Sequence, residues 1–86
     1  MRKEEFEELL RSVVNDYIID EETYDDNAQL CIVPEKWEVY VADSREVDVD
    51  APEIDCYDVM DFVEMDPEAR WKVNEEAIEE VASEYF

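Results

Sequence analysis

The stretch LCIVPEKWEVYVADSREVDVD, residues 30–50, decides the predicted fold class, because its side chains alternate whereas the segments around it follow a helical period. In WEVYVA, the apolar Trp37, Val39 and Val41 are separated by more polar residues. Successive strand residues point to opposite faces, so this pattern indicates a strand with one buried face. LCIV, at the start of the stretch, is short, apolar and partly β-branched, which also favours a strand.

Two short turns divide the stretch into three strands. Pro34-Glu35-Lys36 and Asp43-Ser44-Arg45 carry residues that suit hairpin turns, and in EVDVD the valines alternate with acids. We expect the third strand to lie at an edge, where its acids would discourage pairing with another chain. The sequence therefore predicts a three-stranded antiparallel meander with strands at 30–33, 37–42 and 46–50.

A helix is predicted on the N-terminal side of this sheet, over residues 3–19. Its apolar side chains recur at the spacing of one helical face, and Glu4 and Glu5 suit the positive end of the helix dipole. The residues of this apolar stripe are Phe6, Leu9, Leu10, Val13, Val14 and Tyr17.

Two further helices are predicted after the sheet. Asp50 and Pro52 have the order of a helix entry, and Asn74 is a suitable N-cap for a last helix over 75–85. The predicted fold is a single α+β domain, in which the two C-terminal helices pack on the sheet with the N-terminal one. In the middle helix, over 53–65, one face would carry Cys56, Val59, Met60 and Val63.

The formal net charge of −21 restricts the partners that this chain can have. Nucleic-acid backbones and anionic membrane surfaces would repel it, so we expect no direct binding to either. A basic protein is the natural partner, and a protein whose own ligand is DNA or RNA has the required surface. We expect the chain to be a monomer or a weak dimer.

Two missing residue types bear on catalysis. Without glycine, the chain cannot form a P-loop or a dinucleotide-binding glycine loop. Without histidine, it lacks the commonest general base and the commonest metal ligand. We therefore expect neither an enzyme nor a resident cofactor or metal.

The cysteines and the start of the chain favour a cytoplasmic protein. Cys31 and Cys56 lie in apolar surroundings and are expected to be buried, reduced thiols, with a disulfide as the alternative. No apolar run follows Arg2 and Lys3, so we expect no signal peptide and no membrane span.

The segment from Glu46 to Glu68 carries ten carboxylates and no lysine or arginine. The last helix is also unusual, because it carries three pairs of like charges four residues apart, which disfavours a helix. These pairs are Glu75–Glu79, Glu76–Glu80 and Glu80–Glu84. Lysine at some of these positions would serve folding and solubility at least as well. The negative charge is therefore expected to serve a purpose outside folding.

The size, the charge and the predicted order of elements resemble those of small acidic anti-CRISPR and anti-restriction proteins that act as DNA mimics. The acid-dense DEETYDD at 20–26 and the segment 48–68 are the parts that carry this resemblance. It implies an inhibitor that blocks the nucleic-acid channel of a basic nuclease or of another nucleic-acid-binding protein.

We expect the partner to contact two groups of acids. Tyr57 or Phe62 would add an apolar anchor if exposed, although burial of both is expected. The first group, which no cation interrupts in the sequence, is Asp48, Asp50, Glu53, Asp55, Asp58, Asp61, Glu64 and Asp66, and the second is Asp20, Glu21, Glu22, Asp25 and Asp26.

The acids also allow three other interpretations. A calcium loop of EF-hand type counted from Asp48 would have Glu53 in place of the required glycine and Val59 in place of the final glutamate. A carboxylate pair for glycoside hydrolysis needs a cleft that a domain of this size rarely has. Adaptation of an acidic domain to solubility or high salt is the main alternative to an inhibitor.

Overall fold

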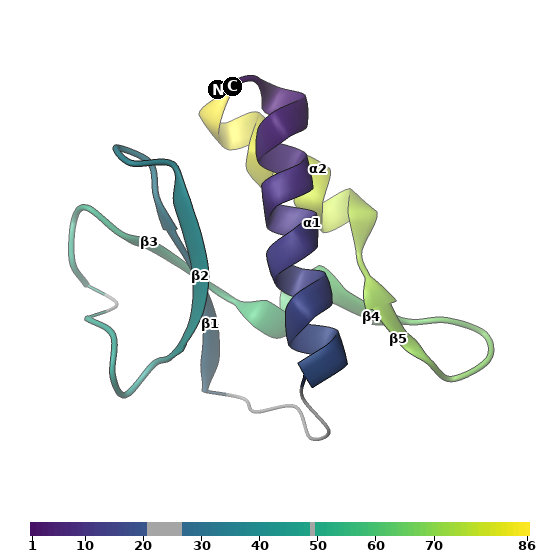
Figure 1. Ribbon diagram of the computed structural model, residues 1–86. Coiled ribbons are helices and arrows are strands. Elements are labelled where there is room, and N and C mark those ends of the chain that lie inside the picture. Colours follow the sequence, from purple (N-terminus) through teal and green to yellow (C-terminus); the bar gives the residue numbers. More distant parts are fainter. Residues whose placement is uncertain (21–26, 49) are drawn as a thin grey trace.

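The structure is a computed structural model that describes residues 1–20, 27–48 and 50–86. In the described part, two α-helices stand side by side against one face of a three-stranded sheet, and a two-stranded hairpin extends from the other side of the helices (Figure 1). The elements are α1 (Lys3–Asp20), β1 (Ala28–Val33), β2 (Glu38–Asp43), β3 (Asp55–Asp58), the 3-10 helix η1 (Val59–Phe62), β4 (Val63–Met65), β5 (Trp71–Val73) and α2 (Glu75–Tyr85).

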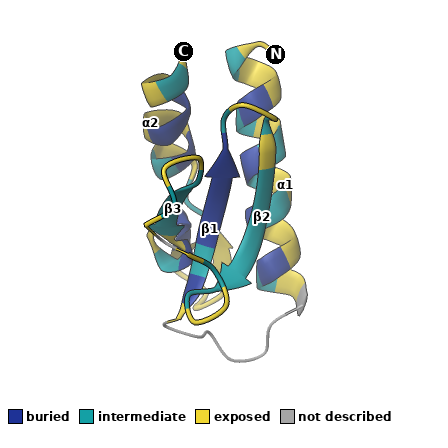
Figure 2. Ribbon diagram, turned by 90° about the vertical axis from the view of Figure 1, so that its left-hand side faces the viewer, coloured by how far each residue is buried: buried dark blue, intermediate teal, exposed yellow. Residues whose placement is uncertain are grey.

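The large sheet has the strand order β2-β1-β3, and both neighbours run antiparallel to β1. The strands β2 and β3 therefore lie at opposite edges of the sheet, and residues 44–48 and 50–54, between them in the chain, lie on the side away from the helices (Figure 1). The strand β1 is almost entirely buried between its neighbours (Figure 2). Its unbroken apolar run LCIV suits a strand covered on both faces.

The predicted meander is wrong in its third strand. Residues 46–48 and 50 form turns and irregular chain, and the third strand is β3, which pairs with β1 instead of β2. The physical reason is that β1 is better suited than β2 to the centre of the sheet, where a strand has neighbours on both sides. β1 is apolar on both faces, whereas β2 exposes Glu38 and leaves its other residues half-buried, as suits an edge strand.

The predicted helix over 53–65 is also wrong, so the described part of the chain contains two α-helices and not three. This segment forms β3, η1 and β4 instead. Its β-branched and aromatic residues favour extended backbone, and β3 supplies hydrogen-bonding partners for a β1 edge that would otherwise be open. Asp58 starts η1 because its carboxylate accepts a hydrogen bond from the backbone N–H of Met60 at 3.0 Å.

The other predicted elements are confirmed. The helix 3–19 corresponds to α1, the strands 30–33 and 37–42 to the β1–β2 hairpin, and the helix 75–85 to α2. The predicted hairpin turn at 43–45 is instead a local turn. Val47 N–H donates to the Asp43 carbonyl oxygen at 3.2 Å, so these residues bond within the turn and not across to β2 as a third strand would.

The core lies between the helices and the inner face of the sheet. One buried hydrophobic cluster contains Phe6 and Leu10 of α1, Leu30 and Ile32 of β1, and Phe62 of η1. Both termini lie at the same end of the domain (Figure 1). Four aromatic rings pack together with centroids 5.0–6.4 Å apart. These rings belong to Phe6, Trp37, Tyr85 and Phe86.

Candidate functional site

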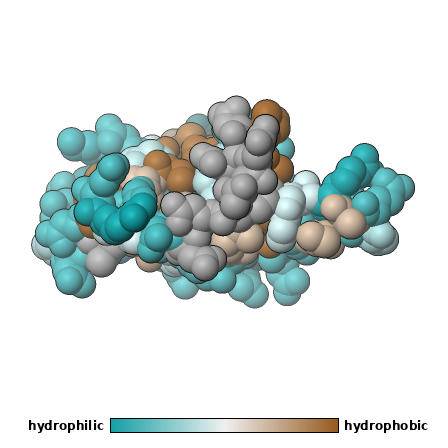
Figure 3. All heavy atoms as spheres, turned by 90° about the horizontal axis from the view of Figure 1, so that it is seen from below, coloured by the Kyte–Doolittle hydropathy of each residue, from teal (hydrophilic) through white to brown (hydrophobic). Residues whose placement is uncertain are grey.

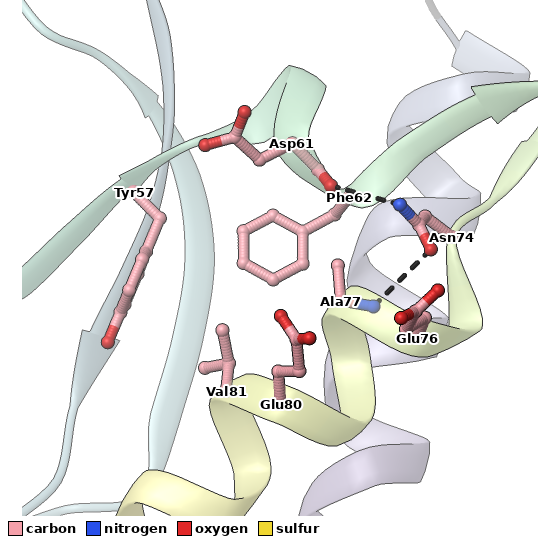
Figure 4. A pocket seen from close by; sticks show the side chains of 8 residues that line it. All are labelled: Tyr57, Asp61, Phe62, Asn74, Glu76, Ala77, Glu80 and Val81. Carbon is pink, nitrogen blue, oxygen red and sulfur yellow. Dashed lines mark hydrogen bonds between the residues drawn. The ribbon is translucent and has the colours of Figure 1, made fainter.

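A groove of about 370 Å³ lies between α2 and the segment formed by β3 and η1 (Figure 4). Its floor is apolar and its sides carry carboxylates, and we call it the acidic groove. The carboxylate of Glu80 points towards the ring of Phe62, whereas those of Asp61 and Glu76 lie further out (Figure 4). The lining residues are Tyr57, Asp61, Phe62, Asn74, Glu76, Ala77, Glu80 and Val81.

Asn74 fixes the two sides of this groove to one another. Its side-chain oxygen accepts a hydrogen bond from Ala77 N–H at 3.3 Å, which caps the first turn of α2. Its side-chain N–H donates to the Asp61 carbonyl oxygen at 3.5 Å, and its backbone N–H donates to the Phe62 carbonyl oxygen at 2.8 Å. The start of α2 is thereby tied to η1.

The acids of α2 form a row along this side of the helix. Glu76, Glu80 and Glu84 are four residues apart, so they share one face and follow one another by about 6 Å along the axis. The opposite side of α2 is buried through Ile78, Val81 and Ala82. The row therefore cannot turn inward, and Glu76 and Glu80 stay at the rim of the groove.

Two hydrogen-bonded tyrosines lie at the Glu84 end of this row. Tyr57 O–H donates to Glu84 at 3.1 Å, Tyr85 O–H donates to Asp55 at 2.5 Å, and the two hydroxyl oxygens are 3.3 Å apart. Burial raises the pKa of both tyrosines, and the hydrogen bonds to Asp55 and Tyr57 raise the pKa of Tyr85 further. Both phenols therefore stay protonated and act as hydrogen-bond donors at neutral pH.

The structure separates the predicted first group of acids into three places. Asp48, Asp50 and Glu53 are exposed on the connection that crosses the outer face of the sheet. Glu53 lies near Glu35 of the β1–β2 turn, since both line one shallow pocket. Asp58 and Asp61 belong to β3 and η1, and Glu64 and Asp66 lie on the β4–β5 hairpin.

Three residues of this group are bound by other side chains of the protein. Asp55 accepts the bond from Tyr85. Glu64 lies 3.5 Å from the ammonium of Lys72, and Asp66 lies 3.5 Å from the guanidinium of Arg70. These cations follow the acid segment in sequence, and the hairpin brings them back beside it. No cation interrupts the group in the sequence, but the fold places Lys72 beside Glu64 and Arg70 beside Asp66, so the charge of these two acids is partly neutralised.

The predicted second group lies mostly outside the described residues. Asp20 is the last residue of α1, and Glu21, Glu22, Asp25 and Asp26 fall in the part of the chain that the structure does not describe. Of the two predicted apolar anchors, Phe62 is buried and Tyr57 is half-buried.

Sequence reasoning missed Glu76, Glu80 and Glu84 as site residues. The available signal was three pairs of like charges four residues apart, Glu75–Glu79, Glu76–Glu80 and Glu80–Glu84. That pattern indicated charge that serves a purpose outside folding, but it did not show that Glu76 and Glu80 would line a groove together with Asp61. Only the chain path through η1 brings these residues together.

The cations of the described part are used mainly in ion pairs elsewhere. Arg11 of α1 binds Glu75 of α2 through Nε, at 2.8 and 2.9 Å from its two carboxylate oxygens, and the hydrogen bond to Arg11 lowers the pKa of Glu75. Among the described residues, Asp61, Glu76 and Glu80 take part in no ion pair. The recorded pairs are Arg2–Glu5, Arg11–Glu75, Arg45–Asp43, Arg70–Asp66, Arg70–Glu68 and Lys72–Glu64.

The exposed hydrophobic side chains of the described residues come from several different parts of the fold. Seen from the end at which α1 stops, hydrophilic side chains cover both flanks and hydrophobic atoms gather near the middle (Figure 3). In the described part, the large hydrophobic side chains that are exposed are Met1, Ile19, Met65, Trp71 and Phe86. They come from both ends of the chain, the end of α1 and the hairpin.

Within the described ranges, no three acidic, cysteine or histidine side chains are grouped so that they could hold a metal ion. In the same ranges, no helix combines the length and the apolar character that crossing a lipid bilayer requires. Comparison of the chain with protein-family models, with curated proteins and with solved structures gives no match.

Proposed function

We propose that this chain is an acidic protein-binding inhibitor that occupies the nucleic-acid channel of a basic protein, such as a nuclease, in place of DNA. The observation that carries the proposal is the acidic groove. Asp61, Glu76 and Glu80 surround an apolar floor, and none of them is used in an ion pair among the described residues. Carboxylates left unpaired in this way remain available to cations of a partner.

The charge density supports a stand-in for DNA. The described Cα atoms extend over 38 Å in their longest direction. Duplex DNA carries one charge per ~1.7 Å of axis, which gives roughly 22 charges over that length. The net charge of −21 is of the same size. A basic channel would therefore meet a comparable total charge in either ligand.

The groove suits a lysine or arginine side chain of the partner. The aliphatic part of such a side chain packs well on apolar surface while its charged end stays near carboxylates. Phe62 and Val81 supply the apolar surface, and Glu80 and Asp61 supply the carboxylates. A single exposed ion pair contributes only about 0–1 kcal/mol, so affinity depends on many pairs acting together.

The size and charge on which the resemblance to acidic DNA mimics rested are unchanged by the structure. The order of elements, on which the resemblance also rested, differs in the structure. In the described part of the chain, the sheet is not a meander and residues 53–65 do not form an α-helix. The proposal therefore rests on the arrangement of charge, and the partner class is the one that this charge selects.

The proposal is tested by competition with DNA. Basic proteins captured from a lysate by the chain would each be loaded with fluorescent duplex DNA, and the chain would be titrated in. We expect displacement of the DNA at close to one chain per binding site, with an affinity that falls steeply as salt is added. Polyglutamate at the same charge concentration is the control and should displace less. Formation of a ternary complex of chain, partner and DNA would overturn the proposal.

Adaptation to high salt makes a different prediction. If the acids serve only that purpose, the chain should capture no basic protein, and its unfolding temperature should rise steeply up to molar salt. An inhibitor is expected to be folded at physiological salt. Thermal unfolding over a salt series separates the two explanations.

A further inference from the structure

Cys31 and Cys56 face each other across the central part of the large sheet. They are direct partners in the antiparallel register of β1 and β3, and their sulfur atoms are 3.9 Å apart. Both are free thiols. They lie on the outer face of the sheet, because their neighbours Leu30 and Tyr57 belong to the core beneath the helices.

This arrangement is compatible with a disulfide without movement of the strands. Directly paired residues in antiparallel strands have Cα atoms about 4.5–5.5 Å apart. Disulfides join Cα atoms that are about 4.4–6.8 Å apart. Side-chain rotation that closes the sulfur separation to about 2 Å is therefore enough.

We propose that Cys31 and Cys56 form an oxidation site, at which a disulfide oxidant such as oxidised glutathione converts the two thiols into a cross-strand disulfide that fastens β3 to β1. The inhibitor function proposed above does not enter into this, since the cysteines lie on the face of the sheet away from the groove.

The reaction proceeds through two thiol–disulfide exchanges. The Cys56 thiolate attacks oxidised glutathione, forms a mixed disulfide and releases one glutathione thiolate. The Cys31 thiolate then attacks the Cys56 sulfur and releases the second glutathione. The protein loses two electrons and two protons, and one oxidised glutathione becomes two reduced molecules.

The burial of the two thiols sets the order of these steps. Cys31 is fully buried, whereas Cys56 is half-buried and is the sulfur that an oxidant in solution can reach. Burial, together with the neighbouring Cys56, raises the pKa of the Cys31 thiol to about 12. Cys31 is thus protected from direct oxidation and reacts only with the partner that touches it.

The disulfide would secure the weakest strand of the sheet. β3 has four residues, forms an edge and is paired only with β1 in the described part. It also carries Tyr57 and Asp55, which hold Glu84 and Tyr85 of α2. A cross-link at Cys56 would therefore hold in place the strand on which the hydrogen bonds to the end of α2 depend.

The experiment is incubation of the folded chain with oxidised glutathione, followed by intact-mass measurement and thermal unfolding. We expect a product lighter than the reduced chain by two hydrogen atoms, with no free thiol. Its unfolding temperature should rise by about 10 °C, because the cross-link closes a loop of some 25 residues. Dithiothreitol should reverse both changes, and this test requires no variant.

Two variants check the order of reaction. Cys31→Ala should keep one glutathione on Cys56 and show no rise in unfolding temperature. Cys56→Ala should keep an unmodified Cys31 while the chain is folded. Retention of both thiols by the folded wild-type chain, disulfide-linked dimers as the main product, or a lower unfolding temperature in the oxidised form would each overturn the proposal.

Discussion

The acidic groove and the β4–β5 hairpin are adjacent in the chain, and both are rich in carboxylates, but only the hairpin neutralises its own. Lys72 pairs with Glu64 at 3.5 Å, and Arg70 pairs with Glu68 at 2.5 Å. The Asp66 carboxylate also accepts bonds from the backbone N–H groups of Glu68 and Arg70, each at 2.9 Å. The density of acids in a sequence therefore does not tell which acids are available to a partner.

The two regions also differ in what lies beneath them. The groove is built on Phe62 and Val81, which belong to the main core. The hairpin has the exposed residues Met65 and Trp71 as direct partners in its register. Disruption of the groove should therefore affect the whole fold, and disruption of the hairpin should remain local.

Replacing Phe62 by alanine is expected to have the largest effect. Phe62 is 1 % exposed and forms the floor of the groove, so its removal leaves a cavity in the core. Such changes cost about 3–5 kcal/mol. Urea unfolding should show a loss of this size.

Met65→Ala in the hairpin is the matched comparison for that change. Met65 is 52 % exposed, so its truncation should change the free energy of unfolding by less than about 0.5 kcal/mol. Equal losses in the two variants would show that the groove is not more deeply connected to the core than the hairpin is.

Reversing the charge of the groove should have the next largest effect, which is a loss of affinity for the partner and not of stability. In the triple variant Asp61→Lys, Glu76→Lys and Glu80→Lys, attraction to a basic partner is lost and repulsion is added at three points. We expect affinity for the captured partner to fall by a factor of about 100 or more at low salt, mainly through slower association. Surface plasmon resonance measures both rates.

The control for this variant carries the same change of net charge elsewhere. Glu8→Lys, Asp16→Lys and Glu35→Lys replace exposed acids outside the groove. They should weaken binding much less, because only the overall field changes. If the two triple variants weaken binding equally, the groove has no special role and net charge alone determines affinity.

The sequence predicted the elements whose side chains have a single clear period. In α1, the stripe from Phe6 to Tyr17 follows one helical face. Val39 and Val41 of β2, and Trp37 directly before it, pack against the core. Residues 53–65 carry a helical pattern, since Cys56, Val59 and Val63 share a helical face. They form β3, η1 and β4 instead, because β3 pairs with β1, and a local pattern does not contain that information.

The candidate site was harder to predict than the fold. The excess of acids identified a class of surface, and Asp61 was among the residues expected in it. Glu76 and Glu80 join Asp61 only because Asn74 ties the start of α2 to η1. Lys72 neutralises Glu64 only because β4 and β5 pair. The groove depends on a contact between residues 13 apart in sequence, and the neutralisation of Glu64 depends on the pairing of two strands joined by a turn.

Asn74→Ala tests the connection between the two sides of the groove. The change removes the cap of α2 and the hydrogen bond to the Asp61 carbonyl oxygen. We expect a loss of about 1–2 kcal/mol in the free energy of unfolding. Asn74→Ser keeps a capping oxygen and should recover most of it. If serine recovers nothing, the bond to Asp61 rather than the cap is the important one.

Ala69→Gly should produce a smaller change of the opposite sign, confined to the hairpin. Ala69 has a φ of 62°, a left-handed conformation that a Cβ atom disfavours. Glycine adopts it without strain but makes the unfolded chain more flexible, so we expect a net stabilisation of about 0.5 kcal/mol. Ala51→Gly, a control in the crossing connection without a positive φ, should destabilise slightly. Destabilisation by Ala69→Gly would show that the hairpin turn is not strained.

The smallest effect is expected from the Asp43–Arg45 ion pair at the end of β2. Asp43 is a further acid that the chain neutralises for itself, and the contribution of this pair to stability should depend on pH. Side-chain and backbone hydrogen bonds from Arg45, at 2.6–2.9 Å, lower the pKa of Asp43 to about 2. Since an aspartate in an unfolded chain has a pKa of about 3.9, this pair stabilises the fold fully above about pH 4, and the contribution is lost as the pH falls towards 2. Carbon-detected NMR titration of the Asp43 carboxylate measures the pKa directly.

Arg45→Ala should raise that pKa only part of the way to its ordinary value, because the backbone N–H of residue 45 still donates to Asp43. The difference in stability between wild type and variant should be greatest near neutral pH and should vanish at about pH 2. The pair is exposed, so the difference should also shrink as salt is added. A difference that persists unchanged in acid would mean that Arg45 acts through packing and not through its bond to Asp43. Asp43 would then no longer count among the acids that the chain neutralises for itself.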